Sequence, residues 1–173
     1  NVKIVEPDNN YRTTDINEIG FTVTEDKLND MTALIKTCAM ESDYLVLSGS
    51  LPKGVPSNYY KQIASDCKTL THVIIDADGE VLRLGIEGSP FLIKPNIHEL
   101  ESAYHQSLDT DEKIINLCRS IIKEHHIHYI LVSMGGDGSI LVSEDFVLKA
   151  EILPVKVVST VGAGDSMLAG MIF

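Results

Sequence analysis

Hydrophobic residues change their spacing from segment to segment along this chain, and the spacing predicts the type of element. Short continuous runs of Val, Ile and Leu are typical of buried strands, whereas apolar residues three or four positions apart indicate amphipathic helices. The runs that predict strands are 44–47, 73–75, 91–93, 129–132 and 155–158. Helical spacing occupies 24–38, 57–69, 98–105, 111–125 and the residues after 162. This alternation predicts an α/β fold with a mostly parallel sheet covered by helices on both faces.

Two regions depart from this alternation and predict β-hairpins. Residues 2–5 and 11–17 have low apolar content and are separated by Pro7-Asp8-Asn9-Asn10, which favours a turn. We expect this hairpin to end near Gly20 and to form a solvent-facing flap. A second hairpin, 139–144 with 146–152, follows the glycine-rich turn 135–138.

Composition limits the classes of partner. The 173 residues are 44% hydrophobic and 23% charged, as in a globular protein with a sizeable core. The net charge of −11 argues against partners that are nucleic acids or anionic membranes, because both require basic patches. No apolar run approaches the roughly 18 residues of a membrane span. Cys38, Cys67 and Cys118 lack CxxC spacing, which favours reduced thiols in a cytoplasmic protein.

Polar and glycine-rich segments follow the predicted strands. In open α/β sheets, ligands bind beyond the carboxyl ends of the strands. Five such segments occur here: 48–50, 76–78, 94–96, 133–136 and 160–165. Because parallel strands end at the same edge of a sheet, we expect these segments to form one ligand-binding edge.

The segment with the most specific chemistry is Gly162-Ala163-Gly164-Asp165, between a predicted strand and the last helix. Small residues allow close approach of a ligand, and the unpaired N–H groups of a first helical turn favour phosphate. Asp165 could accept a proton from a substrate hydroxyl, as phosphoryl transfer requires. The alternative is a plain tight turn in which Asp165 caps the helix. The sequence has no GxxxxGK[ST] motif, which argues against a classical Walker nucleotide site.

The segment from Lys94 to Glu99 allows two interpretations. Asn96 can cap the helix that follows, and Glu99 stands at the spacing of a capping box. Alternatively, Lys94 lies near nucleotide phosphates while Asn96 and Glu99 hold Mg²⁺ through water. Both interpretations stay open on local grounds.

Three other clusters have simpler interpretations. Asp76, Asp78 and Glu80 are expected in a solvated loop, because Asp78-Gly79 is a turn signal. The histidines at 125, 126 and 128 are expected at a helix end, where they favour the dipole, and not at a metal. Residues 133–138 form either a turn before the hairpin or a backbone-lined nucleotide groove.

Six ordered stretches together resemble the phosphofructokinase B branch of the ribokinase-like sugar kinases. They are 1–4, 14–20, 48–55, 94–100, 133–139 and 161–167. The resemblance implies a ribokinase-like three-layer αβα sandwich, with residues 1–20 as part of a small β-lid and 21–173 as an incomplete kinase core. The family's N-terminal sugar-binding region and the residues after its last helix have no counterpart here. We therefore expect a chain truncated at both ends and inactive by itself.

The resemblance also implies a role for each candidate residue. Asp165 would be the catalytic base, with Gly162, Ala163 and Gly164 as the anion hole. The ATP-binding residues would be Lys94, Ser133, Gly135, Gly136 and Gly138. Asn96 and Glu99 would hold Mg²⁺ through water, and Ser50 and Lys3 would contact the sugar phosphate. The lid would close over the sugar and could pair two subunits as a homodimer.

The activity that this resemblance implies is ATP-dependent phosphorylation of a sugar phosphate. Within the branch, the motifs look most like those of fructose-1-phosphate kinases, which form fructose 1,6-bisphosphate. Tagatose-6-phosphate kinase is the alternative substrate class, and a non-catalytic regulator that binds a nucleotide or sugar is the alternative function. A dinucleotide-binding dehydrogenase is disfavoured, because no GxGxxG follows the first strand.

Overall fold

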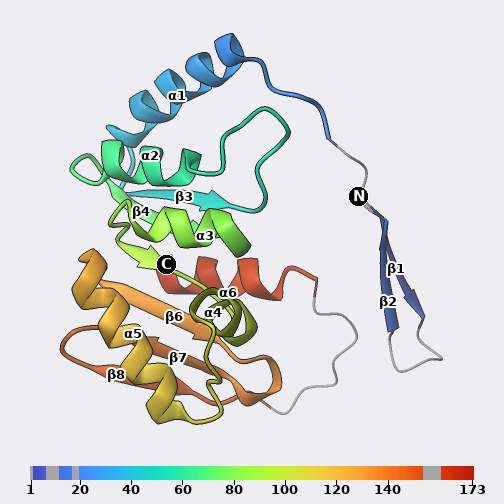
Figure 1. The fold of residues 1–173 in the computed structure, drawn as a ribbon, viewed down its shortest axis with the longest axis vertical. Coiled ribbons are helices and arrows are strands. Elements are labelled where there is room, and N and C mark those ends of the chain that lie inside the picture. The colour runs from blue at the N-terminus through green and yellow to red at the C-terminus, as the bar shows by residue number, and fades with distance from the viewer. Residues whose placement is uncertain (1, 7–11, 17–19, 154–160) are drawn as a thin grey trace.

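A six-stranded sheet organises the computed structural model, which describes residues 2–6, 12–16, 20–153 and 161–173. The strands lie in chain order from β3 to β8 (Figure 1). β3 (Tyr44–Ser48), β4 (His72–Asp76), β5 (Leu92–Ile93) and β6 (Tyr129–Ser133) are parallel. β7 (Ser139–Val142) and β8 (Val147–Ala150) continue the sheet in antiparallel orientation. The prediction of a mostly parallel α/β sheet followed by a hairpin is confirmed.

The first predicted hairpin is also present. β1 (Val2–Glu6) pairs antiparallel with β2 (Arg12–Ile16), with Val2 opposite Ile16. Figure 1 shows this two-stranded sheet standing apart from the six-stranded one. The predicted strand 155–158 lies outside the described residues.

Five helices pack against one face of the large sheet. They are α1 (Glu25–Ala39), α2 (Tyr59–Cys67), α3 (Gly79–Ile86), α4 (Ile97–Tyr104) and α5 (Asp111–His125). Their apolar residues meet inward-facing strand residues such as Ile75, Ile93 and Val132 in the main core. Burial of this apolar surface is the main stabilising contribution to the fold.

The opposite face is covered at its centre by α6 (Ala163–Ile172), which forms the third layer. Leu168 of α6 packs with Ile74 and Leu92 in a second, smaller core. Tyr44 and Val46 on β3 are 41% exposed, and Leu148 on β8 is 58% exposed. Within the described residues, the prediction that helices cover both faces therefore holds only for the middle of this second face.

One prediction about the helices needs correction. The segment expected as a solvated loop after residue 78 is the helix α3, which lacks a strong sequence signal because it is short and contains Gly79 and Gly85. Glycine at 88 is required for packing, since a Cβ there would lie 2.7 Å from the Lys61 carbonyl oxygen. In α1, Thr24 occupies the N-cap position, but its side chain makes no capping hydrogen bond.

No helix in the described part of the chain is long and apolar enough to cross a membrane. The three cysteines are free thiols, and Cys67 and Cys118 are buried. Burial raises the pKa of the Cys118 thiol to about 12, which makes it unreactive.

Candidate functional site

The ends of four parallel strands form one continuous edge, as the sequence predicts. The backbone N–H of Gly49, just after β3, donates to the Asp76 carbonyl at the end of β4 (2.9 Å). The N–H of Lys94, just after β5, donates to the Ile75 carbonyl (3.1 Å), and that of Ser133 donates to the Pro95 carbonyl (3.1 Å). Polar residues far apart in the sequence are thereby fixed side by side.

Lys94 and Asp76 form a largely buried ion pair at this edge. The Lys94 Nζ lies 3.0 Å from Asp76 Oδ1, and the side chains are only 8% and 16% exposed. The prediction that Asp76 belongs to a solvated loop is therefore wrong, although Asp78 and Glu80 are exposed as expected. The available signal was that both residues directly follow buried runs of neighbouring strands, which places their side chains at the same edge.

The first turn of α6 lies against Lys94. Gly162 precedes the helix with φ +76°, in the left-handed region that favours glycine. A Cβ at Gly164 would lie 3.2 Å from the Lys94 Nζ, so the ammonium packs directly against the helix backbone. Asp165 stands exposed in this same turn. Sequence positions 94 and 162–165 are thus brought together.

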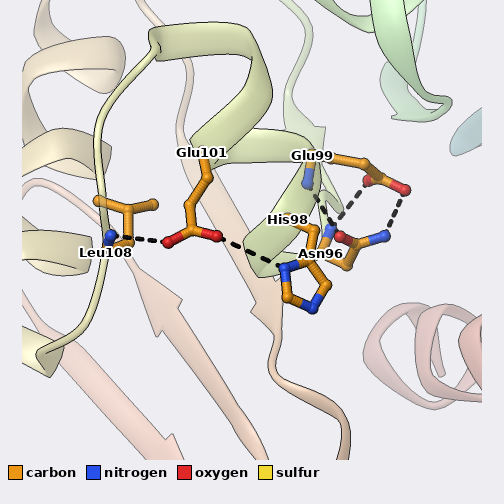
Figure 2. Close-up of polar contacts among 5 residues, drawn as sticks. All are labelled: Asn96, His98, Glu99, Glu101 and Leu108. Carbon is orange, nitrogen blue, oxygen red and sulfur yellow. Dashed lines mark hydrogen bonds and ion pairs between the residues drawn. The ribbon is translucent and has the colours of Figure 1, made fainter.

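Asn96 and Glu99 form the capping box that their spacing predicts (Figure 2). Asn96 Oδ1 accepts from the Glu99 N–H, and Glu99 Oε2 accepts from the Asn96 N–H, both at 2.9 Å. Burial raises the pKa of the Glu99 carboxyl above its usual value, and the nearby charges of Asp78 and Asp76 act in the same direction. The structural interpretation of these two residues is therefore confirmed, and their role toward a metal stays a prediction.

The oxygen atoms at this position fit a hard cation. Mg²⁺ prefers oxygen ligands, keeps several waters and is held by one or two carboxylates together with substrate phosphates. Glu99 and Asn96 supply a carboxylate and an amide oxygen, and a cation would favour the ionised Glu99 that burial disfavours. Among the described residues, no group of three or more His, Cys, Asp or Glu could enclose a metal unaided. A water-mediated site completed by phosphates is the arrangement these residues suit.

The histidine cluster lies at a helix end, as expected. α5 ends at His125, and His126 adopts the left-handed conformation (φ +56°) just after it. The helix C-terminus is where a histidine interacts favourably with the dipole.

The turn after β6 lies beside Asn96. A parallel bridge pairs Asn96 with Ser133, and Gly135–Asp137 form a single 3₁₀ turn. Gly138 has φ +90°, and a Cβ there would lie 2.1 Å from the Ala150 carbonyl oxygen, so no other residue fits. Gly135 and Gly136 are exposed with open space around them, as a backbone-lined groove requires.

Ser50 follows a loop that Tyr60 anchors. The Tyr60 hydroxyl donates to the carbonyls of Ser48 (3.0 Å) and Gly49 (3.3 Å), and burial, with a smaller effect of Asp76, raises its pKa. Sequence reasoning missed this anchor, because residue 60 falls inside the predicted helix 57–69 and nothing in its local spacing indicates a partner after residue 47. Ser50 itself is exposed and lines a cavity of about 490 Å³ with Lys27.

For Lys3, the structure gives the position of the backbone but not of the side chain. Lys3 lies in β1 opposite Asp15, and its side chain is outside the described residues.

A separate cavity of about 570 Å³ adjoins Asn96 and Glu99 and is lined by Arg83 and His98. His98 also faces Glu101, whose carboxylate accepts from the Leu108 N–H (2.9 Å; Figure 2).

The mostly parallel sheet, whose strand ends meet a glycine-flanked helix N-terminus inside an αβα arrangement, has the ribokinase-like class of fold. The chain belongs to the pfkB family of carbohydrate kinases, whose model matches residues 1–173.

Similar proteins include enzymes named for phosphorylated fructose. The chain is 33% identical over 174 residues to 1-phosphofructokinase of Borreliella burgdorferi, covering 100% of the chain and 55% of that protein. It is 34% identical over 160 residues to 1-phosphofructokinase of Bacillus subtilis, covering 92% and 52%. The chain therefore spans about half the length of these curated relatives.

The fold is similar to solved structures of phosphofructokinase-2 from Escherichia coli. The complex of that enzyme with substrates and products aligns with a TM-score of 0.83 and 28% identity, covering 93% of this chain and 53% of that one. Its tetrameric inhibited form aligns with a TM-score of 0.84 at 28% identity, covering 94% and 54%. The three-layer fold with a mostly parallel sheet is confirmed.

Proposed function

We propose that the whole protein carrying these residues transfers the γ-phosphoryl group of ATP to fructose 1-phosphate, forming fructose 1,6-bisphosphate and ADP. The observation that carries this proposal is the contact of the Lys94 ammonium with the first turn of α6, which begins the helix that carries Asp165. A cation and free helix N–H groups converge where a phosphoryl group needs both. The names of the relatives support the substrate.

The proposed reaction assigns one task to each group. Asp165 accepts the proton of the sugar hydroxyl while the hydroxyl oxygen forms a bond to the γ-phosphorus of ATP. The bond between that phosphorus and the oxygen of the leaving ADP breaks. The N–H groups at 162–165 stabilise charge on the transferring group, and Lys94 holds nucleotide phosphates. Ser133, Gly135, Gly136 and Gly138 line the ATP groove with backbone groups. Ser50 and Lys3 contact the sugar phosphate.

Magnesium fits this assignment at Asn96 and Glu99. Bound there through water, it would neutralise phosphate charge on the nucleotide. The two side chains keep their capping role in α4, which fixes their orientation toward the strand ends.

Residues 1–20 form part of a lid in this proposal, and 21–173 form part of the kinase core. The position of the β1–β2 hairpin apart from the large sheet supports a separate closing element (Figure 1). Its exposed strand edges suit pairing between subunits of a homodimer. A tetrameric form of E. coli phosphofructokinase-2 is among the similar structures, which supports self-association in general. The three free thiols support a cytoplasmic location.

The deciding experiment measures ATP-dependent phosphorylation by the whole protein. Fructose 1-phosphate, tagatose 6-phosphate, fructose 6-phosphate and an unphosphorylated pentose are compared by kcat/KM. We expect a clear preference for fructose 1-phosphate. Preference for tagatose 6-phosphate would correct the substrate and retain the site. Binding of ATP without turnover of any sugar would overturn the proposed activity in favour of a regulator.

A further inference from the structure

The Asp76–Lys94 ion pair differs from ordinary surface ion pairs in its burial. Both side chains are nearly buried; Asp76 is the last residue of β4, and Lys94 directly follows β5. Burying two charges costs desolvation free energy, which can exceed the free energy that their mutual attraction returns. A buried ion pair therefore needs an explanation other than stability. The mechanism proposed above uses Lys94 and leaves Asp76 without a task.

The surroundings of the ammonium show what Asp76 does. The Lys94 Nζ packs against Gly164 in the first turn of α6, which is the positive end of the helix dipole. A cation is repelled there, and a flexible lysine side chain would move away into water. The Asp76 carboxylate, 3.0 Å from the Nζ, supplies the opposing attraction.

The backbone that carries this carboxylate is held firmly in place. The Asp76 carbonyl accepts from the Gly49 N–H (2.9 Å), and its strand pairs with β3 on one side and β5 on the other. Lys94 is fixed through its own N–H to the Ile75 carbonyl (3.1 Å). Backbone hydrogen bonds thus fix the two main-chain segments beside each other, so that the side chains of Asp76 and Lys94 can meet.

We infer that Asp76 is a positioning residue that holds the Lys94 ammonium against the first turn of α6, so that cation and helix N–H groups receive the same phosphate. This inference rests on the proposed function for the identity of the phosphate as part of ATP. Asp76 acts through Lys94 and needs no contact with substrate.

A double-mutant cycle on the whole protein tests this inference, with ATP affinity measured by calorimetry. Asp76→Asn should weaken ATP binding by about fivefold or more when Lys94 is present, and by less than about twofold in a Lys94→Met background. Asp76→Glu keeps the charge but displaces it by one methylene, and it should show the same dependence on Lys94. This second variant decides the question if Asp76→Asn fails to fold.

A matched control comes from the Lys36–Asp66 pair, which joins α1 to α2 at 2.7 Å on the surface. Asp66→Asn removes a carboxylate from a lysine in the same way and should leave ATP affinity unchanged. Equal losses of affinity with and without Lys94 would overturn the inference, as would a gain in affinity in Asp76→Asn. A loss seen with Mg²⁺ but not with ATP alone would also overturn it, because Asp76 would then be a metal ligand.

The outcome is separate from that of the proposed function. If the wild-type protein binds ATP but phosphorylates no sugar, the proposed function fails while the binding cycle still decides the role of Asp76. If the wild-type protein binds no ATP, both are overturned.

Discussion

At the scale of single residues, Asp165 and Glu99 are carboxylates in opposite surroundings. Asp165 is exposed in the first turn of α6, next to the backbone that would stabilise a phosphoryl group. Glu99 is half-buried and both oxygens of its side chain accept hydrogen bonds from Asn96. In the proposed function Asp165 would take a proton from the substrate, whereas Glu99 holds α4 and would face Mg²⁺ only through water.

Replacing Asp165 by Asn should separate catalysis from binding. The variant cannot accept the hydroxyl proton, so kcat of the whole protein should fall by roughly 10²–10⁴-fold while ATP affinity stays within a few fold. Steady-state kinetics and calorimetry measure the two quantities. Asp145→Asn, in the exposed turn between β7 and β8, is the matched control. Undiminished turnover in Asp165→Asn would remove this residue from the mechanism.

Glu99 should make stability depend on pH. Its pKa in the folded protein is raised above the ordinary value of 4.5, chiefly by burial. Between these two pKa values the folded state binds more protons than the unfolded state, so the free energy of unfolding should fall as pH rises through that window. Glu99→Gln should remove this part of the pH dependence while its amide oxygen still accepts from the Asn96 N–H. Urea unfolding from about pH 4 to about pH 8 measures the difference.

The control for this pH series is Glu144→Gln, which removes an exposed carboxylate from the turn between β7 and β8, away from any helix end. Its unfolding free energy should follow the wild-type curve across the same range. A Glu99→Gln curve parallel to that of the wild-type protein would show that burial of Glu99 has no energetic effect.

Sequence reasoning succeeded for residues whose roles are local and failed for those defined by a distant partner. Asn96 and Glu99 are three positions apart, so their capping box can be read from spacing alone. Asp76 and Lys94 meet only because β4 and β5 are neighbours in the sheet, and strand order is not encoded in local spacing. The Tyr60 anchor of the loop after β3 was missed for the same reason.

At the scale of elements, the ends of the helices differ in how well they are held. Thr110 begins α5 with its hydroxyl accepting from the Lys113 N–H at 3.3 Å, whereas Thr24 begins α1 without a side-chain bond. The two residues are the same in sequence terms and both precede acidic first turns. Their difference therefore isolates the capping hydrogen bond.

Thr110→Ala should lower the free energy of unfolding by about 1 kcal/mol, the usual contribution of an N-cap hydrogen bond. Thr24→Ala should change it by clearly less. Chemical denaturation of both variants beside the wild-type chain measures the contrast. Equal losses in the two variants would mean that the bond at Thr110 contributes nothing beyond the residue's backbone preference.

Element type could be predicted where the apolar pattern is long, as in α5, whose bounds agree with the sequence expectation. The prediction of element type failed for α3, because its eight residues, with glycine near both ends, show too little periodicity of apolar residues. There the helix depends on packing, since a Cβ at Gly85 would lie 2.9 Å from Ile75 Cδ1. Close contact with its neighbours compensates for a poor intrinsic helix propensity.

At the scale of the whole molecule, the two faces of the sheet are unequal. Among the elements that the structure describes, five helices cover one face, and α6 covers the middle of the other. Apolar residues stay exposed at both margins of that second face: Tyr44, Val46 and Leu148. The aromatic rings of Tyr44, Phe91 and Tyr129 form a row across this face. The ring centroids of Tyr44 and Phe91 are 6.5 Å apart, and those of Phe91 and Tyr129 are 5.2 Å apart.

The 173-residue chain in isolation should therefore self-associate as its concentration rises, because exposed apolar patches gain free energy when buried. The net charge of −11 opposes association, so added salt should strengthen it. Sedimentation measures the average mass. Val46→Lys and Leu148→Lys should reduce association, whereas Met40→Lys, at the exposed end of α1, should not. A monomer at every concentration and salt level would contradict this expectation.

The strand-end edge is assembled from segments that are remote along the chain, and this affects the order in which its parts can fold. The β7–β8 hairpin can form early because its contacts are local, whereas each parallel pair must wait for its crossover to close. Asp76, Lys94 and Gly164 cannot meet until β4, β5 and α6 have all docked. If ATP binds at this edge as proposed, it would bind only after all three elements have docked, and it would stabilise the folded state over intermediates that lack any of them.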